Sequence, residues 1–554
     1  MGGIGVKRLL SCLLCLCLAL PLFGGALAEE GNERQYGTTE DGPLGYFPEP
    51  VTVRVVKGIQ STEADRFSLL ESITGETLYD NRWTDLYERE LNIKIEYLWV
   101  VDESQYQQKL QLAMASGEMP DVVSLPLDQI SSVSEAEQIW ADLTPFFEEY
   151  ASDMLKGSIE AVGYGAIESV TLDGEMKAIP YARNNMDDYK FMFIREDWLR
   201  NVGMEAPTNL EELLAVCDAF VNQDPDGNGE KDTYAMAAEN SLWYHFNPMF
   251  WMYGAYPAVD NRVGVWLEME DGTLANGRIQ PEVKEALRTL QTMHNNGYFD
   301  PEFPLKTEFQ QKPMINANRI GIDFAGNWEV ENLGPVIASV PGCEWKAYPI
   351  PELIPGEPTI GVVGSGVTRG YVINKDMEHP EAIIKMMNLG LIVSQEHPEI
   401  YVDAEVPVIW PLAAVHAPNP GNGYRRIDLI RQVQSGAITA DDLPADIRTI
   451  YDQLETNDKF KSQFGNGDNS SVYLSKMARE NGLVLSSLFF GNPTPTMAER
   501  YSTLEELTRT AFLKIITDNA DVDETFANFV ADWKSLGGDQ MTQEVNERYN
   551  APNP

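Results

Sequence analysis

Three apolar segments decide the fold class: VTVRVV at residues 51–56, IKIEYLW at 93–99 and PDVV at 120–123. In the first two, apolar and polar residues alternate, as they do in a half-buried strand. Helical patterns separate the segments, one around Trp83 to Glu90 and one from Gln105 to Ala115. The order strand, helix, strand, helix, strand is typical of a parallel sheet covered by helices. The sequence therefore predicts an α/β fold.

More helices are expected after this unit. Thr208-Asn-Leu-Glu211 fits a capping box, which predicts a helix that begins at Thr208. Pro281 and Pro380 are each expected to open a further helix. The segment from Leu504 to Trp533 also has helical periodicity. The architecture expected is thus α/β with helical elaboration at the C-terminus.

The N-terminus predicts export from the cytoplasm. The basic pair Lys7-Arg8 precedes an apolar run from Leu9 to Leu20, and Ala26-Leu-Ala28 offers small residues for cleavage. We expect residues 1–28 to be a signal peptide and residues 29–50 to be a flexible leader. The mature protein would then work outside the cytoplasmic membrane. The alternative is an uncleaved membrane anchor, for which the apolar run is short.

The composition excludes some classes of function. The 554 residues include 41 Lys+Arg and 85 Asp+Glu, for a formal net charge of -44. Because sequence-independent binding to nucleic acid needs a basic surface, that class is excluded. Docking on anionic lipid is disfavoured for the same reason. Of the five cysteines, only Cys217 and Cys343 follow the signal peptide, which is too few for a disulfide scaffold.

One segment carries a metal-binding motif, DPDGNGEKD at residues 224–232. Side-chain oxygens stand at positions 1, 3, 5 and 9, and Gly229 stands at position 6, as in the Ca²⁺ loop of an EF-hand. Ala235 replaces the bidentate Glu of position 12, and residues 233–237 suit a strand better than a helix. We expect a structural Ca²⁺ rather than a switch; the alternative is an Asx/Gly-rich turn without metal. The expected ligands are Asp224, Asp226, Asn228, Glu230 through its carbonyl, and Asp232.

The sequence contains no recognisable catalytic motif. The five histidines have no metal-ligand spacing, and there is no G-x-S-x-G, P-loop or G-x-G-x-x-G segment. The many carboxylates could include a glycosidase pair by chance, but no spacing supports one. We therefore expect a protein that is not an enzyme and has no catalytic residue.

Aromatic residues are the second set of candidate ligand contacts. The segment from Trp243 to Tyr253 is dense in rings, and Trp328 follows Gly326-Asn327 in a loop expected at a strand end. Flat rings can stack on the apolar C–H faces of sugars, while carboxylates and amides bind the hydroxyls. Rings also fill protein cores, and that alternative stays open for each of them. The candidates are Trp243, Tyr244, Trp251, Trp328 and Trp410.

Seven short segments, taken in this order and spacing, carry a resemblance to a known family: ASGEMPD (115–121), DLT (142–144), DGEMKAIP (173–180), IREDWL (194–199), GIDFAGNW (321–328), HPEA (379–382) and WKSLGG (533–538). From about Val51 onward, the chain resembles the extracellular solute-binding proteins of bacterial ABC importers. Within them it is similar to the carbohydrate-binding group that includes alginate-oligosaccharide binders. Members of this group also carry a calcium-bound D-P-[DN]-G-N-G loop after a capped helix, which strengthens the expectation of Ca²⁺.

The resemblance implies a two-lobed fold of the periplasmic-binding-protein type (type II), which closes on its ligand about a hinge. The chain would cross between lobes near Ile179 to Tyr181, near Trp345 to Pro351 and near residues 393–400. The implied lobes are residues 50–180 with 349–395 (lobe one) and residues 181–348 with 396–554 (lobe two).

The resemblance also implies ligand contacts near the cleft. Asp128 stands where maltodextrin-binding relatives offer a carboxylate to sugar, although Leu125 replaces the aromatic residue expected before it. Arg183 follows the first crossing and is a candidate cleft residue, or else a partner in a salt bridge between lobes.

The function implied is capture of a carbohydrate, an oligosaccharide, by a monomer that delivers it to an ABC permease. Because Lys and Arg form no cluster along the chain, a neutral sugar is favoured over a uronate. Two alternatives remain: a binder of peptide or another solute, or a sensor subunit, with the same fold; and a secreted carbohydrate-active enzyme.

Overall fold

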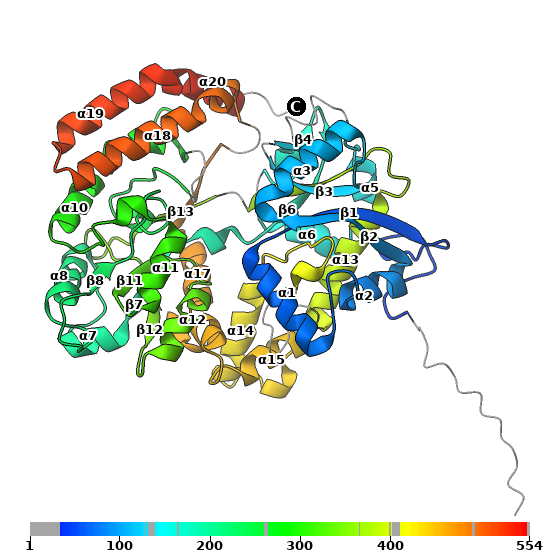
Figure 1. The fold of residues 1–554 in the computed structure, drawn as a ribbon, viewed down its shortest axis with the longest axis horizontal. Helices are drawn as coiled ribbons and strands as arrows, with labels where there is room; N and C mark the ends of the chain where they lie inside the picture. Colours follow the sequence, from blue (N-terminus) through cyan, green and yellow to red (C-terminus); the bar gives the residue numbers. More distant parts are fainter. Residues whose placement is uncertain are drawn as a thin grey trace, which may run out of the picture.

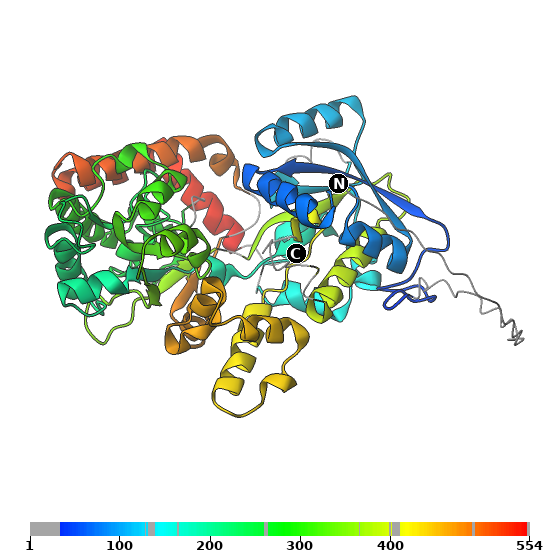
Figure 2. The same cartoon turned by 60° about the horizontal axis from the view of Figure 1, so that its bottom comes forward.

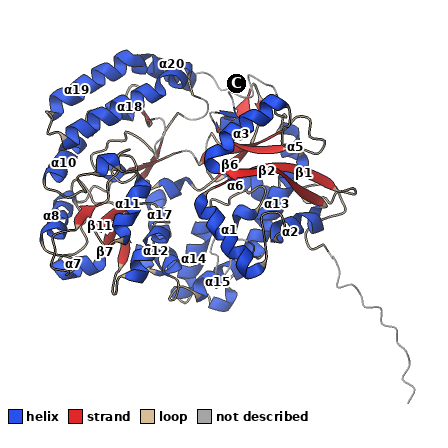
Figure 3. Cartoon of the chain, viewed as in Figure 1, coloured by secondary structure: helices blue, strands red, loops and turns tan. Residues whose placement is uncertain are grey.

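The computed structural model describes residues 34–127, 129–130, 139–162, 165–259, 264–364, 366–397, 400, 410–489 and 493–550. The expected signal peptide lies outside the described residues, and so does Asp128. Two bodies lie side by side (Figure 1). Figure 3 shows that in each body the strands lie inside and most helices lie outside. Among the described helices, none combines the length and apolar character that crossing a bilayer requires.

The first body is built on a five-stranded sheet in the order β2-β1-β3-β14-β6. β1 pairs in parallel with β2 and β3, whereas β14 pairs antiparallel with β3 and β6. Val51, Val53 and Val55 are buried and alternate with more exposed residues, so the strand predicted there is confirmed. The elements of this body are β1 (Val51–Ile59), α1 (Ser61–Thr74), α2 (Arg82–Leu91), β2 (Ile93–Asp102), α3 (Glu103–Ser116), β3 (Val122–Pro126), α5 (Thr144–Tyr150), α6 (Asp153–Glu160), β6 (Ile179–Ala182), β14 (Val367–Ile373) and α13 (Glu381–Glu396).

The second body holds a four-stranded sheet in the order β12-β7-β11-β8. β7 runs antiparallel to β11 and β12, and β11 pairs in parallel with β8. The C-terminal helices α18 and α19, orange to red in Figure 1, pack their apolar residues into the same core. Its elements are β7 (Phe191–Arg195), α7 (Glu196–Val202), α8 (Leu210–Asn222), β8 (Tyr234–Met236), α9 (Asn247–Trp251), α10 (Glu282–Asn295), α11 (Glu308–Asn316), β11 (Ile320–Ala325), α12 (Val330–Ser339), β12 (Trp345–Tyr348), α18 (Pro495–Thr517), α19 (Val522–Trp533) and α20 (Asp539–Tyr549).

A small helical unit has a hydrophobic cluster of its own. Ile427, Ile447 and Phe464 are among its buried residues. Its helices α14 and α15 project from the rest of the molecule in Figure 2. Its helices are α14 (Asn422–Gln434), α15 (Ala445–Asp452) and α17 (Ser471–Glu480). Short strand pairs complete the structure: β4 (Thr171–Leu172) with β5 (Glu175–Met176), β9 (Trp266–Glu268) with β10 (Leu274–Asn276), and β13 (Gly361–Val363) with β15 (Val484–Ser486).

The chain passes from the core of one body to the core of the other at three places. Two of these places differ from the crossings expected from the sequence. Ile350, Val362 and Val363 still pack in the core of the second body, so this change falls between Val363 and Val367 and not near 345–351. The core of the first body then continues to Val415, beyond the crossing expected at 393–400. The first change lies between Ala182 and Met186. The crossing points therefore depend on which core β13 and residues 410–415 pack into, and no local sequence pattern indicates this.

The leader expected to be flexible is ordered over its described part, residues 34–50, so that prediction is wrong there. The backbone N–H groups of Gln35, Tyr36 and Gly37 donate to one oxygen of Glu90, at 2.9, 2.8 and 3.0 Å. Glu90 is fully buried on α2, and these bonds outweigh the effect of burial and hold its pKa below the usual value. The segment is thus fastened to the first body through a buried carboxylate.

We expect Glu90→Gln to lower the free energy of unfolding by about 1–3 kcal/mol, because the amide cannot keep all three charge-assisted bonds. Limited proteolysis should then cut the chain before Phe47 faster than in the original protein. Glu88→Gln is the matched control, since Glu88 lies on the same helix in an exposed ion pair with Lys94 at 3.2 Å. Equal stability of both variants would contradict this role of Glu90.

Candidate functional site

A cavity of about 240 Å³, here called the Trp410 cavity, lies on the first body. The second half of β1, around Lys57, contributes to its lining, together with Ser124 of β3 and Tyr371 of β14. The carboxyl end of β1 and the start of α1 also border it, which is where open α/β sheets place ligands. The other lining residues are Val55, Val56, Gly58, Gln60, Glu63, Glu103, Tyr106, Val122, Tyr181, Arg369, Trp410, Pro411, Ala413, Ala414 and His416.

Aromatic rings form one wall of the Trp410 cavity. The rings of Trp410 and His416 are stacked, with centroids 4.6 Å apart and planes inclined by 25°. The hydroxyl of Tyr181 lies 3.4 Å from Nδ1 of His416, and the backbone N–H of His416 donates to the hydroxyl of Tyr371 at 3.2 Å. Burial and the charge of Lys57 lower the pKa of His416 to about 3, so its ring is neutral at neutral pH. This wall offers flat faces and hydroxyl groups together.

A second cavity of about 240 Å³, the Trp328 cavity, lies on the second body. Trp328 and Tyr244 both line it, with ring centroids 6.2 Å apart, and the hydroxyl of Tyr244 donates to Glu329 at 3.4 Å. Trp328 is half-buried and keeps part of its ring accessible. The remaining lining residues are His245, Lys312, Ile315, Asp323 and Asn332.

A buried ion pair stands behind these rings. Nδ1 of His245 lies 2.7 Å from Oδ1 of Asp323, and the two side chains are 3% and 1% exposed. Burial disfavours the charged imidazole, but the charges of Asp323, Glu239 and Glu329 outweigh it and raise the pKa of His245 to about 9. Burial and the charge of Asp323 raise the pKa of Glu329 to about 8. Nε2 of His245 and Oδ2 of Asp323 have no hydrogen-bond partner among the described residues, so both can still bind a polar group.

The segment from Tyr181 to Asp187 joins the two cavities. The charges of Arg183 and Asp187 both act on the hydroxyl of Tyr181, which lines the Trp410 cavity. On the other side, Nε1 of Trp328 donates to the backbone carbonyl of Asp187 at 3.3 Å, and Nδ2 of Asn327 donates to its carboxylate at 3.1 Å. The Trp328 loop is therefore attached to the segment that follows β6 and leaves the first body.

The second connection between the bodies runs beside the first. The backbone N–H of Arg183 donates to the carbonyl of Gly366 at 2.9 Å. A Cβ at Gly366 would come within 2.6 Å of the Arg183 carbonyl and 2.5 Å of Val162, so only glycine fits this approach. Two crossing segments that touch in this way can act as a paired hinge.

The candidate aromatic residues fall into two groups. Trp328, Tyr244 and Trp410 line the two cavities, and Arg183 lies in the segment between them. The other two, Trp243 and Trp251, are 1% and 2% exposed in the core of the second body. The prediction of ligand contact is wrong for these two, because the rings pack against Phe512 and Tyr189.

Several residues of the Trp410 cavity were not among the candidates from the sequence. Lys57 belongs to a strand, Arg369 and Tyr371 to another, and His416 follows Trp410 by six residues. Lys57 directly follows the strand predicted at residues 51–56, whereas no strand is predicted around Tyr371. Which strand ends face a cavity depends on the pairing of β14 with β3. Tyr181 lies within the expected first crossing, and this position could have indicated it.

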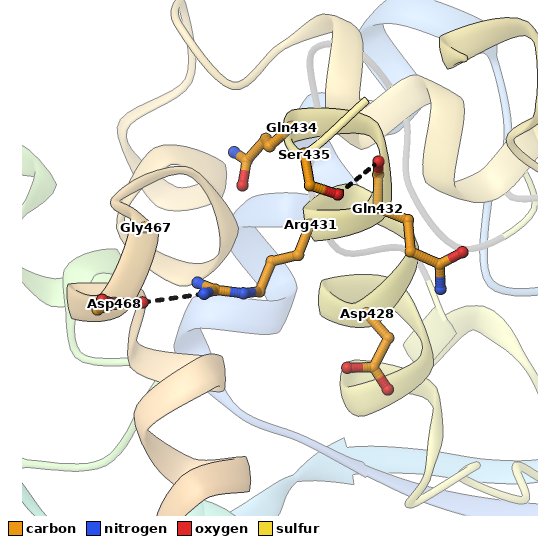
Figure 4. Close-up of a pocket in the computed structure, with 7 residues that line it drawn as sticks. All are labelled: Asp428, Arg431, Gln432, Gln434, Ser435, Gly467 and Asp468. Carbon is orange, nitrogen blue, oxygen red and sulfur yellow. Dashed lines mark hydrogen bonds and ion pairs between the residues drawn. The ribbon is translucent and has the colours of Figure 1, made fainter. Parts of the chain in front are cut away.

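A third hollow, open and shallow, lies on the helical unit beside α14 (Figure 4). Its volume is about 670 Å³. Arg431 donates to Asp468 at 2.9 Å across it, and the hydroxyl of Ser435 donates to the carbonyl of Gln432 at 3.0 Å. Its lining consists of polar residues and Gly467, with no aromatic ring among the seven. It therefore lacks the ring faces that both cavities offer.

The loop at residues 224–232 is held together by its own oxygens. Asp224 accepts from the backbone N–H groups of Asn228 and Gly229, at 3.1 and 3.0 Å. The amide of Asn228 donates to Asp226 at 2.9 Å and to Asp232 at 3.2 Å, so one donor group bridges two carboxylates. Among the described residues, no three His, Cys, Asp or Glu side chains already converge as metal ligands. The donor set of carboxylate, amide and carbonyl oxygens nevertheless fits the chemistry of Ca²⁺.

Curated relatives share parts of this sequence. The polygalacturonan/rhamnogalacturonan-binding protein YtcQ of Bacillus subtilis is 26% identical over 249 residues, which are 43% of this chain and 45% of that protein. The chain thus aligns with less than half of that relative's length.

Solved structures share the fold over almost the whole chain. The substrate-binding protein FusA of Streptococcus pneumoniae in complex with kestose has a TM-score of 0.59 at 14% identity, over 90% of this chain and 99% of that one. The alginate-binding protein AlgQ2 without calcium ion has a TM-score of 0.58 at 16% identity, over 92% of this chain and 100% of that one. These likenesses show a shared two-lobed solute-binding fold.

A match to one protein family covers residues 63–391, more than half of the chain. That family is described as bacterial extracellular solute-binding protein. The matched region includes the four-stranded sheet, every strand of the five-stranded sheet except β1, the loop at residues 224–232 and the Trp328 cavity. The chain therefore belongs to the bacterial extracellular solute-binding proteins.

Proposed function

We propose that this protein captures an oligosaccharide between its two bodies, outside the cytoplasmic membrane, and delivers it to the permease of an ABC importer. One observation carries the proposal: the Trp328 and Trp410 cavities offer aromatic faces beside polar side chains on different bodies, joined by residues 181–187. Flat faces suit sugar C–H surfaces, and the neighbouring polar groups suit hydroxyls. The names of YtcQ and of the FusA complex with kestose support a saccharide.

The step performed is binding without chemistry. A ligand that contacts both bodies favours the closed arrangement by the difference between its affinities for the closed and open states. In this proposal the contacts come from Trp328 and Tyr244 on one side, Trp410 on the other, and Arg183 at the hinge. Residues 1–28 act as the signal peptide, and the mature protein works as a monomer without nucleic acid. Asp128 remains a proposed contact that lies outside the described residues.

Thermal unfolding of residues 29–554 with a panel of neutral and acidic oligosaccharides tests this function. A ligand that binds only the folded state stabilises it, by about 2.7 kcal/mol at a ligand concentration of 100 Kd, and therefore raises Tm. We expect one class of sugar to raise Tm and to be recovered intact by chromatography. Hydrolysis of the sugar would favour the enzyme alternative. No rise with any sugar, together with a rise with peptides, would overturn carbohydrate capture.

We further propose that residues 224–232 bind a structural Ca²⁺. Asp224, Asp226, Asn228, Asp232 and the carbonyl of Glu230 supply five hard oxygens, and water completes the coordination. Contacts from the two residues that precede β11 support a fixed loop: Asn318 donates to Asp226 at 3.1 Å and Arg319 donates to Asp232 at 3.1 Å. Bound Ca²⁺ would bridge the carboxylates of Asp226 and Asp232, which the amide of Asn228 bridges by its two hydrogen bonds.

Removing Ca²⁺ with EDTA should lower Tm, and added Ca²⁺ should restore it, because a metal that binds only the folded loop stabilises the fold. Asp226→Asn should make Tm insensitive to EDTA. Asp271→Asn is the matched control, because Asp271 also caps a turn, accepting from the N–H of Thr273 at 3.0 Å. An equal Tm with EDTA and with Ca²⁺ in the original protein would leave the loop as a turn without metal.

A further inference from the structure

Two basic side chains line the Trp410 cavity without a carboxylate partner. The ammonium group of Lys57 donates to the backbone carbonyl of Pro411. Arg369 is exposed on β14 and forms no ion pair or hydrogen bond with the described residues. Burial lowers the pKa of Lys57 to about 8, and the charge of Arg369 adds to this effect, whereas the charges of Glu63 and Glu103 oppose it. The cavity thus brings together two positive charges that no described carboxylate pairs with directly.

Two acidic residues also line the cavity: Glu63, which is engaged in a helix cap, and Glu103, which lies against Gly58. Glu63 stands in the first turn of α1 and accepts the N–H of Gln60 at 3.0 Å in a capping box. Glu103 is the first residue of α3, and a Cβ at Gly58 would lie only 2.2 Å from its Oε2. Carboxylates at helix N-termini are stabilised by the helix dipole and by free N–H groups. Their charges moderate the field in the cavity but form no ion pair with Lys57 or Arg369.

A third observation points to a ligand in the same place. The hydroxyl of Ser124 is buried and has no hydrogen-bond partner among the described residues. Ser124 pairs with Tyr371 across β3 and β14, and Arg369 is two residues from Tyr371, so the three side chains share one face of the sheet. A buried hydroxyl is seldom left without a partner in a native protein. An acceptor atom bound between these residues would satisfy it.

We propose that the Trp410 cavity binds the carboxylate of a uronic acid residue, with Lys57 and Arg369 as its counter-charges and Ser124 as a hydrogen-bond donor. This inference rests on the proposed function and names the class of saccharide. The ring of Trp410 lies beside these groups and offers a face for the sugar ring. The sequence alone favours a neutral sugar, because Lys and Arg form no cluster along the chain: Lys57 and Arg369 are 312 positions apart. In the fold, the pairing of β14 with β3, and of β3 with β1, brings these two residues to one cavity.

Matched pairs of trisaccharides test this inference. The probes are the trimers of galacturonate, mannuronate and guluronate, each compared by calorimetry with its carboxyl-reduced neutral trimer. We expect at least one uronate trimer to bind about 10- to 100-fold more tightly than its neutral counterpart, as a charge-assisted pair predicts. Arg369→Gln should remove most of this difference. Lys94→Gln, the same charge change on the same body but outside the cavity, should not.

A second readout separates a direct contact from a general effect of charge. Because the pKa of Lys57 is lowered, a bound carboxylate should raise it, and binding at pH 8 should take up protons. Calorimetry in two buffers of different ionisation enthalpy measures this uptake, which Lys57→Met should abolish.

The outcomes separate the two proposals. Neutral trimers that bind as tightly as their uronates, and lose binding in Trp328→Ala, would overturn the uronate inference but keep saccharide capture. Equal weakening of uronate binding and of neutral-trimer binding by Arg369→Gln would likewise overturn the uronate inference and keep saccharide capture. No binding by any uronate trimer overturns the inference; no binding by any saccharide of the wider panel overturns the proposed function as well.

Discussion

Trp328→Ala should weaken oligosaccharide binding by about 30- to 1,000-fold, because loss of a central aromatic contact costs about 2–4 kcal/mol of binding free energy. The ring is half-buried, lines its cavity beside Tyr244 and is oriented by the bond from Nε1 to the Asp187 carbonyl. Trp328→Phe keeps a flat face and should lose less. Calorimetry with the saccharide that gives the largest thermal shift measures both variants.

Trp243→Phe is the control that separates stacking from stability. Trp243 is 1% exposed, donates through Nε1 to Glu505 at 3.0 Å and is not among the residues that line the Trp328 cavity. We expect it to lower the free energy of unfolding by about 1–3 kcal/mol and to leave Kd unchanged. If Trp243→Phe weakened binding as much as Trp328→Ala, the effect would come from destabilisation of the second body, and the contact assigned to Trp328 would be wrong.

Local patterns predicted the elements of the fold well. The strand at residues 51–56 and the helix after Pro281 occur where periodicity placed them, since one buried face imposes its period on the sequence. The cap of α8 differs by one residue: Asn209, not Thr208, accepts the N–H of Glu212 at 3.0 Å, and Glu212 rather than Glu211 bonds back to Thr208. The prediction and the structure place the helix cap within the same five residues, and only the backbone geometry shows that the N-cap residue is Asn209.

Long-range packing decided what the sequence could not. Trp243 and Trp328 are both candidate ligand contacts by sequence, yet the C-terminal helix α18 covers Trp243 through Phe512, more than 250 positions away. Residues 34–50 are polar and rich in glycine, but the buried carboxylate of Glu90 orders them. The basic pair of the Trp410 cavity comes from β1 and β14, two strands that are far apart in the sequence. None of these contacts can be predicted from the local sequence, because each joins residues that are far apart in the chain.

Asp323→Asn should lower the free energy of unfolding by about 3–5 kcal/mol, the usual cost of removing one partner from a buried ion pair. His245 and Asp323 are 2.7 Å apart and almost fully buried, so the loss would leave the imidazole without its counter-charge. Glu381→Gln is the matched control: Glu381 pairs with His379 at 2.9 Å, but that imidazole is 39% exposed. We expect the control to cost less than about 1 kcal/mol. Urea unfolding at pH 7 compares the two.

The same cluster sets the sign of a pH effect. The pKa of His245 is raised to about 9 and that of Glu329 to about 8, so the folded protein binds protons that the unfolded chain has released. This contribution to stability is complete below the unfolded pKa values and is lost as pH rises, through about 8 for Glu329 and about 9 for His245. Stability should therefore fall from about pH 4.5, the unfolded value for Glu329, to about pH 9, with His245 contributing above 6.5. Asp323 raises both pKa values, so Asp323→Asn should flatten the profile, whereas Glu381→Gln should leave its slope intact. An unchanged slope in Asp323→Asn would show that other groups govern the pH dependence.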